Sequence, residues 1–157
     1  MSILLTGGIG LLELPPQAVA IKEAGVPLIL GIIVAISILS GKSLVTAFLS
    51  QALPLDDIEK SLDQTQKTEY DRLLKVFSRG FAASFLISAI LNYILAKVIV
   101  TADAGTEEFT AQLGKMTGLS FPVIALPMMI VMMSLMIRFV FRLQKVTGRG
   151  IEELLDT

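Results

Sequence analysis

The sequence contains no cysteine and no histidine. A chain without cysteine forms no disulfide and has no thiol nucleophile, and a chain without histidine has no imidazole base. These two residue types are also the usual protein ligands of zinc and of haem iron. We therefore expect a protein that is not an enzyme, with no cofactor and no metal site.

Charge is also scarce. Charged residues make up 17% of the 157 residues, against about 25% in ordinary globular domains, and hydrophobic residues make up 54%. The mean hydropathy is +0.76. The net charge of -1 gives no general attraction for nucleic acid. This composition indicates that the main partner is a lipid bilayer and that nucleic acid is not a partner.

Three stretches are long and apolar enough to cross a bilayer, which takes about 20 helical residues. Residues 24–41 and 116–137 carry no charge, and residues 80–102 carry only Lys97. A lysine near the end of a span reaches the headgroups with its long side chain. The sequence therefore predicts an all-α fold: a polytopic helical membrane protein with three full transmembrane helices, in a single domain over residues 1–157.

The apolar stretch at the start of the chain is shorter. Residues 1–12 carry no charge, but as a helix they would span about 18 Å, less than the roughly 30 Å of a hydrocarbon core. Two interpretations are open: a re-entrant or interfacial segment, or a truncated half-span whose beginning is absent from this chain. We favour the second.

Basic residues predict the orientation, because lysine and arginine are retained on the cytoplasmic side. Residues 42–79 carry six of them and the chain after residue 137 carries four, while the opposite side carries three: Lys22, Lys97 and Lys115. We therefore expect the 42–79 loop and the C-terminus to lie in the cytoplasm.

Residues 54–79 of that loop are predicted to form a cytoplasmic amphipathic helix. Pro54 ends the preceding helix, and Asp56 followed by Glu59 is typical of an N-terminal capping signal. Three acid-to-base pairs four residues apart favour a surface helix: Asp56–Lys60, Asp63–Lys67 and Asp71–Lys75. The helix is either a solvated connector or a docking surface for a partner.

A ridge of small and polar residues runs along the second span. Gly80, Ser84, Ser88 and Asn92 lie four residues apart, which places them on one helix face. Small residues let membrane helices approach closely, and hydroxyl or amide groups bond across such contacts. The ridge is therefore interpreted as a helix-packing seam, with a polar path for a solute as the alternative.

Prolines and an isolated charge pair mark the other two spans. Pro122 and Pro127 in the third span each lack a backbone donor, so we expect a helix bend there. Lys22 and Glu23 precede the first full span, with Pro27 in its expected first turn. We interpret them as an interfacial charge pair in which Glu23 caps the helix; a buried pair used in proton or ion coupling is the alternative.

Three blocks carry a family resemblance: TGGIGLLELPPQAVAIKEAGVPLILGIIVAIS, then ASFLISAILNYILAKVIV with AGTEEF, then KMTGLSFPVIALPMMIVMM. Together they resemble an uncharacterised family of bacterial multi-spanning inner-membrane proteins, over essentially the whole chain. More distantly, the chain is similar to the intracellular septation protein A family, whose members span the inner membrane and are associated with envelope synthesis and division. The resembling family carries further spans ahead of the GGIG block, so this chain is expected to lack them.

The resemblance supplies no catalytic residues, and it implies a multi-pass protein of the bacterial inner (plasma) membrane. We expect a non-enzymatic protein that acts by helix–helix or protein association, with a membrane-protein partner or as a homo-oligomer, in envelope or septation processes. The alternative is a component of a small-solute transporter or channel. For that function Asn92, the two serines of the ridge and the two prolines are the candidate residues.

Overall fold

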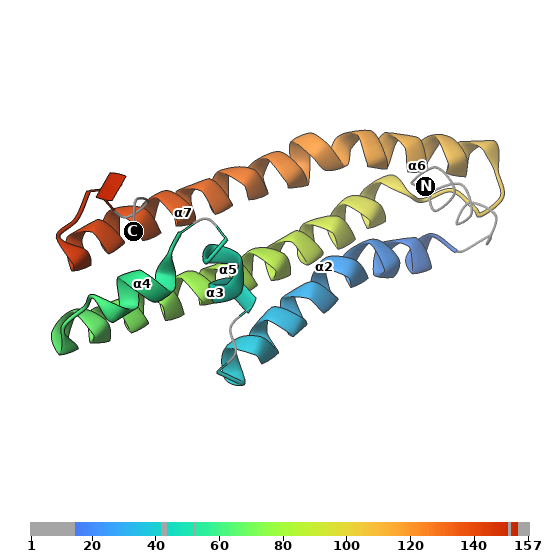
Figure 1. Ribbon diagram of the computed structural model, residues 1–157. Helices are drawn as coiled ribbons and strands as arrows, with labels where there is room; N and C mark the ends of the chain where they lie inside the picture. The colour runs from blue at the N-terminus through green and yellow to red at the C-terminus, as the bar shows by residue number, and fades with distance from the viewer. Residues whose placement is uncertain (1–14, 42–43, 52, 151, 154–157) are drawn as a thin grey trace. The chain divides into compact units, whose positions relative to one another are not determined.

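The computed structural model describes residues 15–41, 44–51, 53–150 and 152–153, and the elements in these ranges are all helical. Figure 1 labels them along the chain: α2 (Pro16–Leu39), α3 (Leu44–Leu49), α4 (Leu55–Lys60), α5 (Gln64–Ile99), α6 (Glu107–Ser120), the π-helical segment η1 (Phe121–Ala125) and α7 (Leu126–Thr147). The predicted all-α class is confirmed for this part of the chain. The half-span predicted at residues 1–12 lies outside the described residues.

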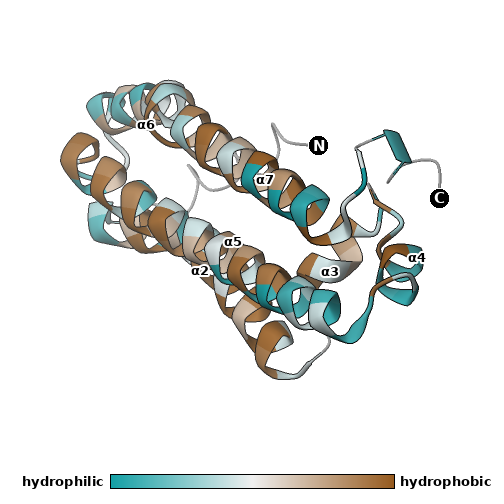
Figure 2. Ribbon diagram, turned by 90° about the vertical axis from the view of Figure 1, so that its left-hand side faces the viewer, coloured by the Kyte–Doolittle hydropathy of each residue, from teal (hydrophilic) through white to brown (hydrophobic). Residues whose placement is uncertain are grey.

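Three helices are long and apolar enough to cross a membrane: α2, α5, and the continuous helix that runs from Glu107 to Thr147. Only 17%, 17% and 11% of their most apolar windows are buried within the protein. Figure 2 shows apolar residues in brown along all three and hydrophilic residues in teal over α4. Apolar surface left open on this scale is typical of a chain whose solvent is lipid.

The chain divides into two compact units, and each of the three long helices contributes to both. The first unit combines Met1–Leu30 with Phe85–Met129. The second combines Gly31–Ser84 with Ile130–Thr157.

In the first unit, a small apolar core joins α2, α5 and α6. It consists of Val19, Ala20, Ala96, Val100, Phe109 and Met116. Thr106 caps α6 by accepting a hydrogen bond from the Phe109 N–H at 3.1 Å. Gln112 Oε1 accepts hydrogen bonds from the backbone N–H groups of Thr101 at 2.7 Å and Ala102 at 2.9 Å. These bonds hold the turn between α5 and α6 in place.

In the second unit, α5 and α7 pack through aromatic side chains. Tyr70, Phe77 and Ser84 are buried at intervals of seven residues along α5, the spacing that keeps one helix face against a nearly parallel partner. The ring centroids of Phe77 and Phe139 lie 5.0 Å apart. The two short helices add further buried residues: Val45 and Leu49 from α3, Leu55 and Ile58 from α4.

The start of α2 differs from the prediction. The helix begins at Pro16, where a missing backbone donor costs nothing. Lys22 and Glu23 therefore lie within the helix, and Pro27 lies in its interior instead of its first turn. The prediction that Glu23 caps the start of this helix is wrong. The helix starts at the prolines upstream, at Pro16, and not after the charged residue Glu23.

The segment 54–79 is not one helix, because the helical structure is interrupted between the end of α4 at Lys60 and the start of α5 at Gln64. Asp63 caps α5: its Oδ1 accepts hydrogen bonds from the N–H groups of Thr65 and Gln66, both at 2.8 Å. In return, Gln66 Oε1 accepts a hydrogen bond from the Asp63 N–H at 3.0 Å. This reciprocal arrangement is a capping box, and it starts a new helix at this point.

The capping signal predicted from Asp56 and Glu59 is not used. The residue that precedes α4 is Pro54, and it makes no side-chain capping bond. Asp56 instead lies in the first turn of α4, where a negative charge interacts favourably with the helix dipole.

Candidate functional site

The first member of the predicted ridge lies at a close approach of two helices. In the second unit, a Cβ built on Gly80 would lie 2.9 Å from Leu135 Cδ2 and 3.3 Å from Leu135 Cδ1 on α7. Carbon atoms in contact normally lie about 3.5–4.0 Å apart. A side chain at Gly80 would therefore require Leu135 to move, and the glycine gives α5 and α7 their short separation here.

Ser84 lies one turn further along the same face and is 5% exposed. Its hydroxyl donates a hydrogen bond to the Phe81 carbonyl oxygen at 2.7 Å and lies 3.6 Å from Met132 Sδ on α7. The hydroxyl is satisfied mainly within its own helix, and the thioether adds a weak acceptor. In the second unit, Gly80 and Ser84 thus both face α7.

Ser88 and Asn92 continue the ridge in the first unit, where both are half-buried. Asn92 Nδ2 donates to the Ser88 carbonyl oxygen at 2.8 Å and lies 3.4 Å from Ser88 Oγ. Within the part of the chain that the structure describes, no donor lies within hydrogen-bond distance of Asn92 Oδ1. The amide therefore uses its donor locally and leaves its carbonyl acceptor available.

Pro122 and Pro127 lie at a change of helix type. The five residues Phe121–Ala125 form a π-helical turn, in which the Leu126 N–H donates to the Phe121 carbonyl oxygen. A proline cannot donate to the carbonyl four residues earlier, and a widened turn redistributes the bonds around that gap. The helix remains continuous on both sides. The predicted bend stays a prediction.

Lys22 and Glu23 form an ion pair on α2. Lys22 Nζ lies 3.1 Å from Glu23 Oε1, and the side chains are 40% and 31% exposed. Partly exposed pairs of this kind contribute about 1 kcal/mol or less to stability. The pair is not buried, which weighs against the alternative of proton or ion coupling.

Two ion pairs in the second unit join different partners from those predicted. Lys60 Nζ lies 3.1 Å from Asp57 Oδ1, whereas Asp56 was the predicted partner. Lys67 Nζ lies 2.9 Å from Glu59 Oε1, which connects α5 to α4 instead of pairing with Asp63. The break between the helices explains the second difference, since Asp63 precedes α5 as its cap and Glu59 of α4 reaches Lys67 instead. The first difference arises within α4, where Lys60 pairs with the acid three residues earlier instead of four.

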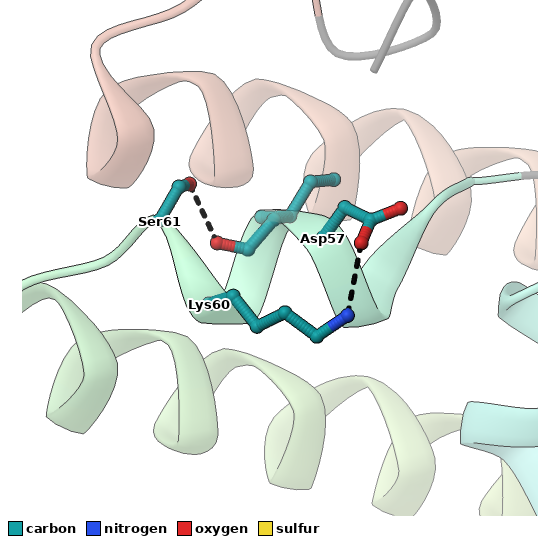
Figure 3. A network of polar contacts seen from close by, with 4 residues as sticks. Asp57, Lys60 and Ser61 are labelled. Atoms are coloured by element: carbon teal, nitrogen blue, oxygen red, sulfur yellow. Dashed lines mark hydrogen bonds and ion pairs between the residues drawn. The ribbon is translucent and has the colours of Figure 1, made fainter.

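Figure 3 shows the α4 contacts at close range. The Lys60 amine points to Asp57, and the Ser61 hydroxyl donates to the Ile58 carbonyl oxygen at 2.7 Å. The hydrogen bond and the negative charge of Asp57 raise the pKa of the Lys60 amine above its ordinary value. These contacts close the last turn of α4, and Lys60 is fully exposed, so they are local structural contacts.

A basic groove of about 480 Å³ lies between α5 and α7 in the second unit. Its walls carry four basic residues and one acidic residue: Arg72, Arg138, Arg142, Lys145 and Glu69. In the sequence these basic residues predict orientation, and their separation along the chain gives no indication that they share one surface. One sequence signal pointed to part of this surface. Arg138, Arg142 and Lys145 are spaced by four and three residues, which puts all three on one helix face.

Comparisons of this chain with protein-family models, with curated proteins and with solved structures found no match.

Proposed function

We propose that this chain is a non-enzymatic, multi-pass protein of the bacterial inner membrane that acts by association of its helices with a membrane-protein partner or with further copies of itself. The observation that carries the proposal is the half-buried amide of Asn92, whose Oδ1 acceptor has no donor among the described residues. The family resemblance noted in the sequence suggests envelope synthesis or division as the process.

Asn92 lies at a depth where an unused acceptor has consequences. It follows Gly80 by twelve residues, so it lies about 18 Å along the helix from the charged end of the span. No water is available there to satisfy an amide oxygen, and each unsatisfied polar group in hydrocarbon carries a large desolvation cost. A donor from a neighbouring helix removes that cost, and this is how polar residues promote helix association in membranes.

The test measures association in lipid. Copies of the chain labelled with donor or acceptor fluorophores are mixed in vesicles, and energy transfer is followed as lipid is added to dilute the protein. Asn92→Leu keeps the branching of the side chain at Cγ and removes both the amide donor and the acceptor. We expect association about fivefold weaker, since interhelical hydrogen bonds in membranes contribute about 1 kcal/mol.

The matched control is Ser134→Ala on α7. The Ser134 hydroxyl bonds to the Ile130 carbonyl oxygen at 2.7 Å within its own helix, and the side chain is exposed. This variant also removes one polar group from a span but should leave association unchanged. Equal association by wild type and Asn92→Leu at every dilution would remove the basis of the proposal.

The proposed topology places residues 42–79 and the C-terminus in the cytoplasm. It is supported by the second unit, which collects ten of the thirteen lysines and arginines of the chain. The first unit contains the other three, Lys22, Lys97 and Lys115, with acidic residues around the turn that precedes α6.

A second candidate function, solute transport, is favoured by the π-helical turn at Phe121–Ala125. Such turns recur at functional sites, and transporters place substrate sites at interrupted helices. Replacing Ser84, Ser88 and Asn92 together by Ala, Ala and Leu separates the two functions. Lost association with intact insertion favours the first, whereas lost solute flux in vesicles with intact association favours transport.

A further inference from the structure

The basic groove of the second unit differs in its electrostatics from the other charged surface of that unit. Lys60 and Lys67 lie within 3.1 Å and 2.9 Å of carboxylate oxygens. In contrast, among the described residues no carboxylate oxygen lies within 4.0 Å of a basic group of Arg72, Arg138 or Lys145. The same holds for Arg142, so among the described residues none of the four basic side chains is paired with a carboxylate, and with Glu69 as its one acidic residue the groove keeps an excess of positive charge.

The groove also has an apolar side. Leu73 and Val76 line it from α5, and Val76 is 52% exposed. A second hollow on α7 shares Arg138, Arg142 and Lys145 with the groove and adds apolar side chains. Of these, Ile137 is 48% exposed and Phe141 is 60% exposed. The basic groups of the groove therefore lie directly beside open apolar surface.

The basic residues of the groove on α7 directly follow an apolar stretch that is long enough to span a bilayer. The uncharged stretch 116–137 ends where Arg138 begins. Four residues of helix rise by about 6 Å, so Arg138 and Arg142 fall within about one headgroup layer of the end of the apolar stretch. A surface that is basic at this level and apolar next to it matches one class of molecule, an amphiphile with an anionic head.

We propose that Arg72, Arg138, Arg142 and Lys145 bind the phosphate of an anionic phospholipid, with an acyl chain lying along Ile137 and Phe141. Guanidinium groups bind phosphate oxygens through paired hydrogen bonds, and basic pockets between membrane helices hold anionic headgroups. This proposal rests on the bilayer placement proposed above.

The test uses the full chain in a non-ionic detergent and native mass spectrometry. Palmitoyl-oleoyl phosphatidylglycerol is titrated against palmitoyl-oleoyl phosphatidylcholine at the same concentrations. We expect one phosphatidylglycerol to bind in preference. Arg138→Gln with Arg142→Gln should weaken this binding about thirtyfold, since each basic residue near an anionic surface contributes a factor of about five.

The matched control is Lys75→Gln with Arg79→Gln, which removes the same charge from exposed positions of α5 outside the groove. It should bind phosphatidylglycerol as wild type does. Should the first pair of substitutions prevent folding, Val76→Glu tests the same groove by placing a carboxylate beside the bound phosphate, and it should also weaken binding. Equal losses from both pairs of substitutions, or no preference over phosphatidylcholine, would overturn the proposal.

Three further measurements distinguish a lipid phosphate from a soluble phosphate, test nucleic acid as the ligand, and test bilayer placement separately from lipid binding. If glycerol 3-phosphate displaces phosphatidylglycerol at similar concentrations, the groove binds soluble phosphate compounds and the lipid proposal is wrong. A short single-stranded DNA that binds with the same dependence on Arg138 and Arg142 would also overturn it. Carbonate extraction of membranes tests bilayer placement independently, so its failure is distinguishable from a failure of lipid binding.

Discussion

The contact between Gly80 and Leu135 allows a quantitative test of how α5 and α7 pack. The Cβ of a leucine at position 80 would lie 2.9 Å and 3.3 Å from the two methyl carbons of Leu135. Overpacking of this kind costs about 1–3 kcal/mol. Replacing glycine in a helix returns about 0.8 kcal/mol of backbone entropy and propensity. We therefore expect Gly80→Leu to lower the free energy of unfolding by a net amount of up to about 2 kcal/mol.

Two further variants isolate the contact. At Gly25 on α2, an added Cβ would meet nothing within 4 Å, so Gly25→Leu should be neutral or slightly stabilising. Leu135→Ala creates room opposite position 80, and in that background Gly80→Leu should lose most of its cost. The double-mutant cycle should therefore show a coupling close to the overpacking cost of about 1–3 kcal/mol, above the roughly 0.5 kcal/mol within which independent sites add.

The assay is reversible unfolding by sodium dodecyl sulfate in mixed micelles, followed by energy transfer between fluorophores on α5 and α7. The absence of cysteine means that introduced single cysteines carry the labels without background. The packing argument would be refuted if Gly80→Leu and Gly25→Leu behaved alike, or if the cost of Gly80→Leu were the same with and without Leu135.

Three other predictions concern the turn of the first unit, the topology and the pH dependence. Gln112→Ala should destabilise the first unit by about 1–3 kcal/mol, because the N–H groups of residues 101–102 lose their acceptor; thermal unfolding measures this. In intact cells, a membrane-impermeant maleimide should label Thr110→Cys but not Thr68→Cys, two exposed positions, and labelling of the second would reverse the proposed topology. Burial and nearby carboxylates raise the pKa of Tyr70, in the charged part of α5 outside its apolar stretch, to about 12 from 10.0. The folded state then keeps this proton at a pH where the unfolded state loses it, so stability should fall as pH rises from about 10 to about 12, and Tyr70→Phe should show a smaller fall.

The apolar stretches could be located from the sequence because lipid excludes charge over a length fixed by the bilayer. Residues 24–41, 80–102 and 116–137 each overlap one of the three long helices. Their helical bounds could not be obtained in the same way. The helix around residues 116–137 begins at Glu107, where Thr106 caps it, because helix ends depend on capping bonds and not on polarity.

The break near residue 61 shows the limit of local patterns. Asp56 with Glu59 and Asp63 with Gln66 fit the same capping signal, since each places an acid three residues before Glu or Gln. Tertiary packing decides which of the two signals caps a helix. Leu55 and Ile58 of α4 are buried in the second unit, and this burial favours a short separate α4 over a continuous helix. A prediction from one continuous helix then pairs Lys67 with Asp63, whereas the structure pairs it with Glu59 of α4.

The basic groove was missed for a related reason. Arg72 on α5 lies 66 residues before Arg138 on α7, and no periodicity within one helix relates the two. Only the packing of α5 on α7 in the second unit brings them to one surface. The ridge on α5 was easier to identify, because its four members belong to a single helix and their spacing alone defines a face.

The hydroxyl groups of the apolar helices bond to carbonyl oxygens of their own helix: Ser37 to Val34, Ser84 to Phe81, Ser120 to Met116 and Ser134 to Ile130. These four hydroxyl groups are thus paired within their own helices before the helices meet a neighbour. Internal pairing of this kind is what a helix needs in order to enter lipid on its own, so we expect chains interrupted after any one of the three long helices to partition into a bilayer.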